Sequence, residues 1–183
     1  MSLLATPLFF FSDGRRSTLD SMVAQEAVTL LLAARNGDLS SLQSDKVTES
    51  LQDEQGANCL HYAARGGFVS VLKYLVNVRG FKPTQRSKVG ATALHDAAAT
   101  GNLEALQWLL EQADAKVDDQ DGTGATVTHL SARYGHAQSV QWLLDETNCD
   151  VLKKSASGAL PLHFAADTGH LECVKILIAE APR

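Results

Sequence analysis

The sequence predicts an all-α fold, a solenoid of stacked helix–turn–helix units joined by short hairpin-like turns. Two observations support this prediction. A glycine and a histidine five residues further on recur together every 34 residues along most of the 183-residue chain. After each copy comes a second apolar segment with helical spacing. Repetition at one fixed period is typical of solenoids, in which each unit packs only against its neighbours.

The repeated segments align without gaps. They read GANCLHYAARGG, GATALHDAAATG, GATVTHLSARYG and GALPLHFAADTG, and start at Gly56, Gly90, Gly124 and Gly158. An earlier segment, AVTLLLAARNGDLSSLQ, matches the pattern more loosely and predicts a divergent first repeat. We therefore expect about five repeats of 34 residues, at residues 24–52, 53–86, 87–120, 121–154 and 155–183.

Each part of a repeat has a physical reason in the sequence. The first glycine centres a turn, and a short alanine-rich helix follows, whose small side chains let neighbouring helices approach closely. A second glycine, such as Gly101, tolerates the left-handed conformation that ends a helix. The second helix then carries apolar residues at helical spacing, including Leu106 and Leu109. Trp108 and Trp142 share one register there, and we expect them to pack between repeats.

The two ends of the chain differ from the repeats. We predict that residues 1–21 form a disordered leader before an array at residues 22–183, with a docking strand as the alternative. The leader is not a signal peptide, because Pro7 interrupts its apolar segment and no basic residue precedes it. The last residues, ILIAEAPR, end a second helix without a polar capping unit. We therefore expect the array to be truncated at its C-terminus.

Composition and charge argue against several classes of partner. The formal net charge of −5 disfavours nucleic-acid binding, which needs a concentrated basic face. No apolar run approaches the ~20 residues that cross a bilayer, so we expect no membrane partner. The three cysteines form no C-x-x-C pair and no even framework, which favours a reducing, cytoplasmic environment. We expect the protein to be a monomer.

Four histidines at equivalent positions raise the question of a metal site. Equivalent residues of stacked helices lie about 8–10 Å apart, whereas zinc holds nitrogen ligands at about 2.0–2.1 Å. We therefore expect neither a metal nor a cofactor. Instead, each ring should close its own turn by bonding to the backbone or to a nearby hydroxyl, Thr92 for His95 and Thr126 for His129. The four histidines are His61, His95, His129 and His163.

The adjacent pair His95 and Asp96 does not indicate an enzyme. Neighbouring residues of a helix point about 100° apart, so these two side chains diverge. The sequence also has no nucleophile elbow and no phosphate-cradling glycine loop before a helix. A metal-dependent or hydrolytic enzyme is therefore the least favoured hypothesis.

The segment GATALHDAAATGNLEALQWLL resembles the ankyrin repeat, with its turn, its T-P-L-H helix start and its G-H-L-E second helix. The resemblance covers residues from about 24 to 180 and recurs four times. Four features depart from the family pattern, and two of them are Thr128 in place of the usual leucine and Leu160 in place of the usual threonine. The proline of the helix start is present only at Pro161, and the period is one residue longer than is common.

A narrower resemblance is to the N-terminal ankyrin array of the espins, actin-bundling proteins of microvilli and stereocilia. The longer period and the two QWLL segments, residues 107–110 and 141–144, contribute most to it. The resemblance implies a non-enzymatic protein-binding module of the actin cytoskeleton. Its partner would be a class III myosin tail or the protein's own downstream segment. The alternative is a generic cytosolic ankyrin regulator or adapter subunit unrelated to actin.

The resemblance also places the register of Asp96 at the edge of a concave groove. Its equivalents Tyr62, Leu130 and Phe164 differ in chemistry while their neighbours stay constant. We therefore interpret this register as one that the stack does not dictate and that recognition can use. Residues before each second glycine and at the turn tips complete the predicted groove. The predicted binding residues are Glu54, Gln55, Tyr62, Arg65, Lys88, Val89, Asp96, Ala99, Thr100, Thr123, Leu130, Arg133, Tyr134, Phe164, Asp167 and Thr168.

Overall fold

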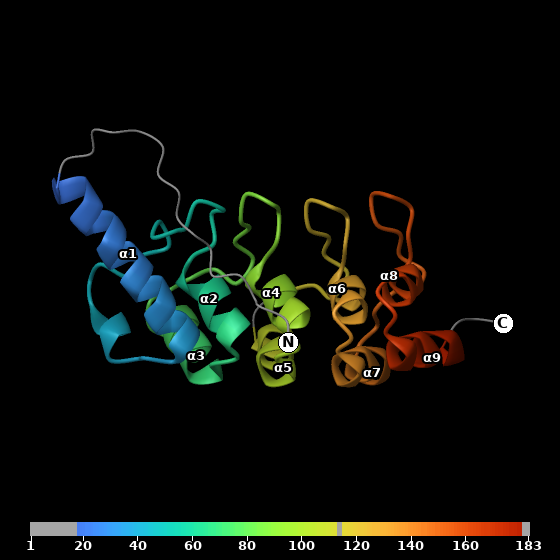
Figure 1. The fold of residues 1–183 in the computed structure, drawn as a ribbon. Coiled ribbons are helices and arrows are strands. Elements are labelled where there is room, and N and C mark those ends of the chain that lie inside the picture. Colours follow the sequence, from blue (N-terminus) through green and yellow to red (C-terminus); the bar gives the residue numbers. More distant parts are fainter. Residues whose placement is uncertain (1–17, 113–114, 181–183) are drawn as a thin grey trace.

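Paired helices follow one another along the chain in a computed structural model that describes residues 18–112 and 115–180 (Figure 1). The first repeat contains α1 (Thr18–Asn36) and the 3-10 helix η1 (Ser41–Gln43). The later repeats contain α2 (Cys59–Gly66) with α3 (Val69–Asn77), α4 (Ala93–Thr100) with α5 (Leu103–Gln112), α6 (Val127–Arg133) with α7 (Ala137–Glu146), and α8 (Pro161–Asp167) with α9 (Leu171–Ala179). In the described part of the chain, none of these helices is both long and apolar enough to cross a bilayer.

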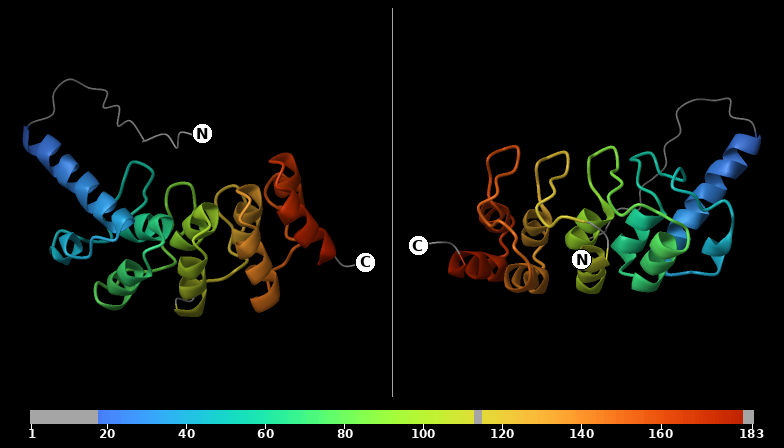
Figure 2. Two further views of the ribbon diagram at one scale, coloured as in Figure 1. Left: turned by 60° about the horizontal axis from the view of Figure 1, so that its bottom comes forward. Right: turned by 180° about the vertical axis from the view of Figure 1, so that it is seen from behind.

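The helices form two parallel rows. Helices α2, α4, α6 and α8 make the inner row, in which each helix packs against the next, and α3, α5, α7 and α9 make the outer row (Figure 1). The turns that join one repeat to the next all project to the same side of the inner row, as the view from behind also shows (Figure 2). This arrangement confirms the predicted all-α solenoid.

The first repeat departs most from the pattern. Its second helix is reduced to η1, which Asp38 precedes, accepting hydrogen bonds from the Ser40 hydroxyl at 2.6 Å and from the Ser41 main-chain N–H at 3.2 Å. Its first helix, α1, begins at Thr18, three residues before the predicted end of the leader at residue 21. Extending a helix that has already been nucleated costs little. Residues 1–17 lie outside the described residues.

The turns form a continuous bonded wall, which confirms their predicted hairpin-like shape. Each turn is closed by a main-chain bond across its glycine, such as Ser87 N–H to Ala91 O at 2.8 Å, and the glycine adopts a positive φ, 76° at Gly90. Each tip also binds the tip before it. The bonds run from Lys88 N–H to Gln55 O at 2.8 Å, from Gly122 N–H to Val89 O at 2.8 Å, and from Ala156 N–H to Thr123 O at 2.9 Å.

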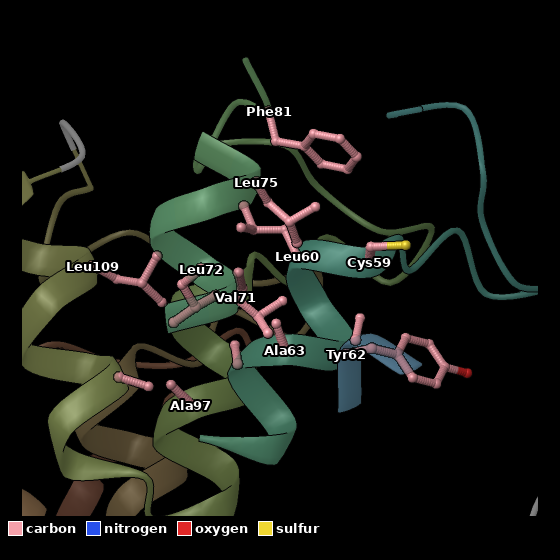
Figure 3. Packing of buried hydrophobic residues seen from close by; sticks show 14 of the residues in the cluster. Cys59, Leu60, Tyr62, Ala63, Val71, Leu72, Leu75, Phe81, Ala97 and Leu109 are labelled. Carbon is pink, nitrogen blue, oxygen red and sulfur yellow. The ribbon is translucent and has the colours of Figure 1, made fainter. Parts of the chain in front are cut away.

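The core lies between the two rows of helices. Leu60, Leu72, Ala97 and Leu109 are almost completely buried and come from both rows (Figure 3). Small residues at the contacts let inner helices approach closely, as the alanine pattern predicts. Trp108 is buried in this core and Trp142 packs on its edge, which confirms that both stack between repeats. A smaller cluster closes the C-terminal end, formed by Ala132, Val140, Ala165, Cys173 and Leu177.

The junction of the two helices in a repeat also contacts the next repeat. Gly67 caps α2 with φ 76°, and the Asn102 side chain lies against it. The Asn102 amide donates to Ala64 O at 3.0 Å and to Arg65 O at 2.9 Å, the last carbonyls of α2. Carbonyl oxygens at a helix end need such partners. One side chain therefore completes a helix in the preceding repeat.

Candidate functional site

The repeated histidines tie successive repeats together. The Thr92 hydroxyl lies 2.8 Å from His95 Nδ1, and His95 Nε2 lies 3.1 Å from Asp119 O in the next turn. A carbonyl oxygen only accepts, so Nε2 carries the proton and Nδ1 accepts from the hydroxyl. His129 repeats this arrangement with Thr126 at 2.9 Å and Ala159 O at 3.1 Å. The predicted turn-closing bonds are confirmed, and each ring also bridges to the next repeat.

Burial keeps these rings neutral. Desolvation lowers the pKa of His61, His95 and His129 below the usual value of 6.5. The two nitrogens of His95 are both engaged by protein groups, which leaves no lone pair for a metal ion. Among residues 18–112 and 115–180, no three His, Cys, Asp or Glu side chains gather as metal ligands do. The histidines therefore serve the fold.

Asp96 itself is not independent of the stack, whereas its register was interpreted as one that the stack does not dictate. Its Oδ1 lies 3.0 Å from Nε of Arg65 in the preceding repeat, and the two side chains are 13% and 30% exposed. Burial raises the pKa of the Asp96 carboxyl, and the Arg65 guanidinium opposes that rise. The other oxygen, Oδ2, is buried and has no hydrogen-bond partner among the described residues. The two predicted binding residues are thus engaged with each other.

Tyr62 is also less accessible than its register predicts. Only 8% of this residue is exposed, because α1 packs along α2 and its ribbon passes beside the ring (Figure 3). The Tyr62 hydroxyl donates to Asp53 Oδ2 at 3.1 Å, and the Arg65 guanidinium lies 5.1 Å from the ring centre. The first helix of the chain therefore withdraws this position from solvent.

Most of the remaining predicted residues are exposed. Val89, at a turn tip, is 55% exposed, and Tyr134, at the end of α6, is 50% exposed. The exposed members of the predicted set are Glu54, Gln55, Lys88, Val89, Thr100, Thr123, Arg133, Tyr134, Asp167 and Thr168. Ala99, Leu130 and Phe164 are half-buried. We call the exposed and half-buried residues together the turn-side face.

The C-terminal part of the turn-side face contains a cation held among aromatic rings. The Arg133 guanidinium carbon lies 5.9 Å from the Tyr134 ring centre and 5.8 Å from the Phe164 ring centre. The Phe164 ring packs edge-on against His129 at 5.1 Å and 81°. Beside these groups is an open cavity of about 610 Å³. It is lined by Arg133, Ser157, Ala159, His163, Phe164, Ala166, Asp167 and Thr168.

Two bridging side chains were missed by the sequence interpretation. Arg86 Nη1 donates to Gly90 O and to Gln120 O, both at 2.7 Å, and so links two successive turns. Gln120 Nε2, at the same register one repeat later, donates to Gly124 O at 2.6 Å and to Lys154 O at 2.9 Å. Long donor side chains spaced 34 residues apart were the available signal. They fix the turn tips relative to one another.

Comparison with known families agrees with this architecture. The sequence model of ankyrin repeats, in three copies, matches the chain at residues 30–121 and again at residues 101–182. A search of curated proteins finds no match. Ankyrin repeats generally serve as non-enzymatic modules for protein–protein interaction, and no catalytic family is indicated. The two matches together span residues 30–182, and the chain therefore belongs to the ankyrin-repeat family.

Proposed function

We propose that the turn-side face binds a peptide segment of a protein partner. The observation that supports this function best is the cluster of exposed Arg133 and Tyr134 with half-buried Phe164. Tyr and Arg are over-represented among the residues that contribute most to binding energy. Here Arg133 and Phe164 line an open cavity, and Tyr134 lies next to Arg133.

The rigidity of the face supports the same function. Tip-to-tip main-chain bonds and the bridging side chains of Arg86 and Gln120 hold neighbouring turns in register. A surface that is already ordered loses little conformational entropy when a partner binds, so more of the contact energy appears as affinity. The same bonds would keep the spacing of contacts constant along an extended or helical segment.

The identity of the partner is proposed from the amino-acid sequence of the repeats. The segments GATALHDAAATG and QWLL resemble the array of the espins, whose corresponding region binds class III myosin tails or the espin's own downstream sequence. We propose a partner of that kind and a place in actin-based protrusions. The alternative partner is one recruited by a generic ankyrin adapter unrelated to actin.

Calorimetric titration with a class III myosin tail peptide tests the proposal. Replacing both Tyr134 and Phe164 with Ala should weaken binding by at least tenfold, because truncating an interface hot spot costs about 2 kcal/mol or more and about 1.4 kcal/mol corresponds to a factor of ten. Val78→Ala is the matched control, since Val78 is 69% exposed just beyond α3 in the outer row. Far-ultraviolet circular dichroism confirms that each variant is folded.

Two results would change the conclusion in different ways. Unchanged affinity in the doubly substituted variant would show that the turn-side face does not bind the peptide. Failure of the unsubstituted protein to bind the myosin peptide, together with capture of another partner through the same two residues, would favour the adapter alternative.

A further inference from the structure

Two arginines in the array occupy the same register but have different partners. Arg65 and Arg133 lie two repeats apart, each near the end of an inner helix. The residue 31 positions later, in the next repeat, is Asp96 for the first and Phe164 for the second. Both later residues contact their arginine, at 3.0 Å for the Asp96 carboxylate and at 5.8 Å for the Phe164 ring centre. The Arg65–Asp96 contact can therefore be compared directly with the Arg133–Phe164 contact at the same register.

Because Phe164 stands where the earlier repeat has Asp96, Arg133 has no anionic acceptor among the described residues. Across the described residues, no carboxylate oxygen lies within 4.0 Å of its guanidinium, and its N–H groups make no side-chain hydrogen bond. Contacts with the faces of Tyr134 and Phe164 use the positive charge but do not accept the planar array of five N–H donors. Arg133 is also exposed, whereas only 30% of the Arg65 side chain is.

The surroundings restrict what can supply that acceptor. The cavity beside Arg133 is walled by Phe164, Ala159 and Ala166, which favour an apolar group. Asp167 also lines it and is not ion-paired with Arg133 within 4.0 Å. A carboxylate of a partner would be repelled near Asp167 and is therefore favoured only on the Arg133 side of the cavity. The chemistry that fits is a carboxylate on Arg133 next to an apolar side chain on Phe164.

We propose that Arg133 and Phe164 form a recognition site for an acidic residue adjacent to an apolar residue in the partner peptide. The partner's carboxylate takes, against Arg133, the place that Asp96 takes against Arg65. This inference rests on the proposed peptide-binding function and adds the sequence class of the peptide. A guanidinium matches a carboxylate through two parallel hydrogen bonds, which gives the site its selectivity.

Selection of random 12-residue peptides displayed on phage, with the whole chain as bait, tests the site directly. Peptides enriched on the unsubstituted protein should carry Asp or Glu next to Leu, Ile or Phe, and Arg133→Gln should abolish that enrichment. Phe164→Asp should do the same, because it supplies an internal acid as Asp96 does. Arg65→Gln is the matched control: it should lower the melting temperature and leave the selected peptides unchanged.

A double-mutant cycle on one selected peptide separates this site from the rest of the face. Arg133→Gln and the peptide's Glu→Gln should each weaken binding about tenfold, and the two together no more than either alone. Enrichment of basic peptides, or additive losses in the cycle, would overturn the acidic site while the peptide-binding function stands. Affinity that is insensitive to Tyr134 and Phe164 as well would overturn the function itself. Arg133→Gln removes no buried group, so it keeps the test valid even where Phe164→Asp does not fold.

Discussion

At the scale of single residues, one side chain can hold two repeats together. His95 accepts from the Thr92 hydroxyl within its own turn and donates to Asp119 O in the next. His61 and His129 make the same crossing, to Ala91 O at 3.2 Å and to Ala159 O at 3.1 Å. His163 accepts from Leu160 N–H at 2.9 Å and is exposed. The repeated histidine is therefore buried where it bonds to a carbonyl of the following turn, and exposed at His163.

The three buried histidines should make the array less stable in mild acid. Burial lowers their pKa below 6.5, so just below that pH the unfolded chain binds protons that the folded chain does not. The free energy of unfolding therefore rises with pH in this window and is lost as the pH falls through it. The slope is at most about 1.4 kcal/mol per pH unit for each histidine. Urea unfolding between about pH 5 and about pH 7 measures it.

A variant assigns the slope to these groups. His95→Gln removes one of the three titrating rings, so the pH dependence should shrink by about a third. Asp96 acts in the opposite sense, because burial raises its pKa above 3.8 and the folded chain then holds the extra proton. An identical slope in the variant would show that other groups cause the dependence.

At the scale of elements, the turns differ in what lies behind their glycines. Gly124 and Gly158 have similar backbones, with φ of 74° and 80°. A β-carbon at Gly124 would collide with the backbone of Ala156 in the next turn, whereas no described atom lies within 4 Å of one at Gly158. Glycine is thus required at Gly124 both by its conformation and by the approach of its neighbour.

The two glycines should respond unequally to alanine. Each substitution forces a left-handed residue, which costs about 1–2 kcal/mol. Gly124→Ala adds a backbone collision, and overpacking of this kind costs about 1–3 kcal/mol more. The shift in urea midpoint should therefore be clearly larger for Gly124→Ala than for Gly158→Ala. Equal shifts would mean that the turns separate easily and that the tip-to-tip wall contributes little.

At the scale of the whole molecule, burial is uneven along the array. One large cluster of buried side chains extends from α1 to α5 and includes Val127 and Leu143 from the following repeat. The smaller C-terminal cluster contains five buried residues, and the α9 side chains of Leu171 and Ile178 are 64% and 58% exposed. In a repeat array each unit is stabilised by its own contacts and by its interfaces with neighbours.

Hydrogen exchange should follow this gradient. Amides of α8 and α9 should exchange faster than those of α4 and α5, because the C-terminal unit shares fewer buried contacts and opens at lower free energy. Mass spectrometry of peptic fragments resolves the two regions within one sample. Uniform protection along the chain would indicate instead that the repeats unfold as a single cooperative unit.

The features that could be predicted from sequence are those that recur. Gly90 and His95 each have counterparts 34 residues away, and their roles depend on contacts that every repeat reproduces. The reduction of the first repeat's second helix to η1 could not be predicted in this way, because that segment matches the later repeats only loosely. The side chains of Arg86 and Gln120 bond to the next repeat, and the pattern within one repeat does not predict contacts between repeats.

The sequence by itself determined the period, the helix pairs, the glycine turns and the turn-closing histidines, because short-range sterics and hydrogen bonds act within one repeat. Only the tertiary structure decided which members of the variable register are accessible. α1 covers Tyr62, and Arg65 engages Asp96. Phe164 lies beside Arg133, which pairs with no carboxylate in the described part of the chain. Exposure and pairing depend on atoms contributed by neighbouring repeats, and no single repeat contains that information.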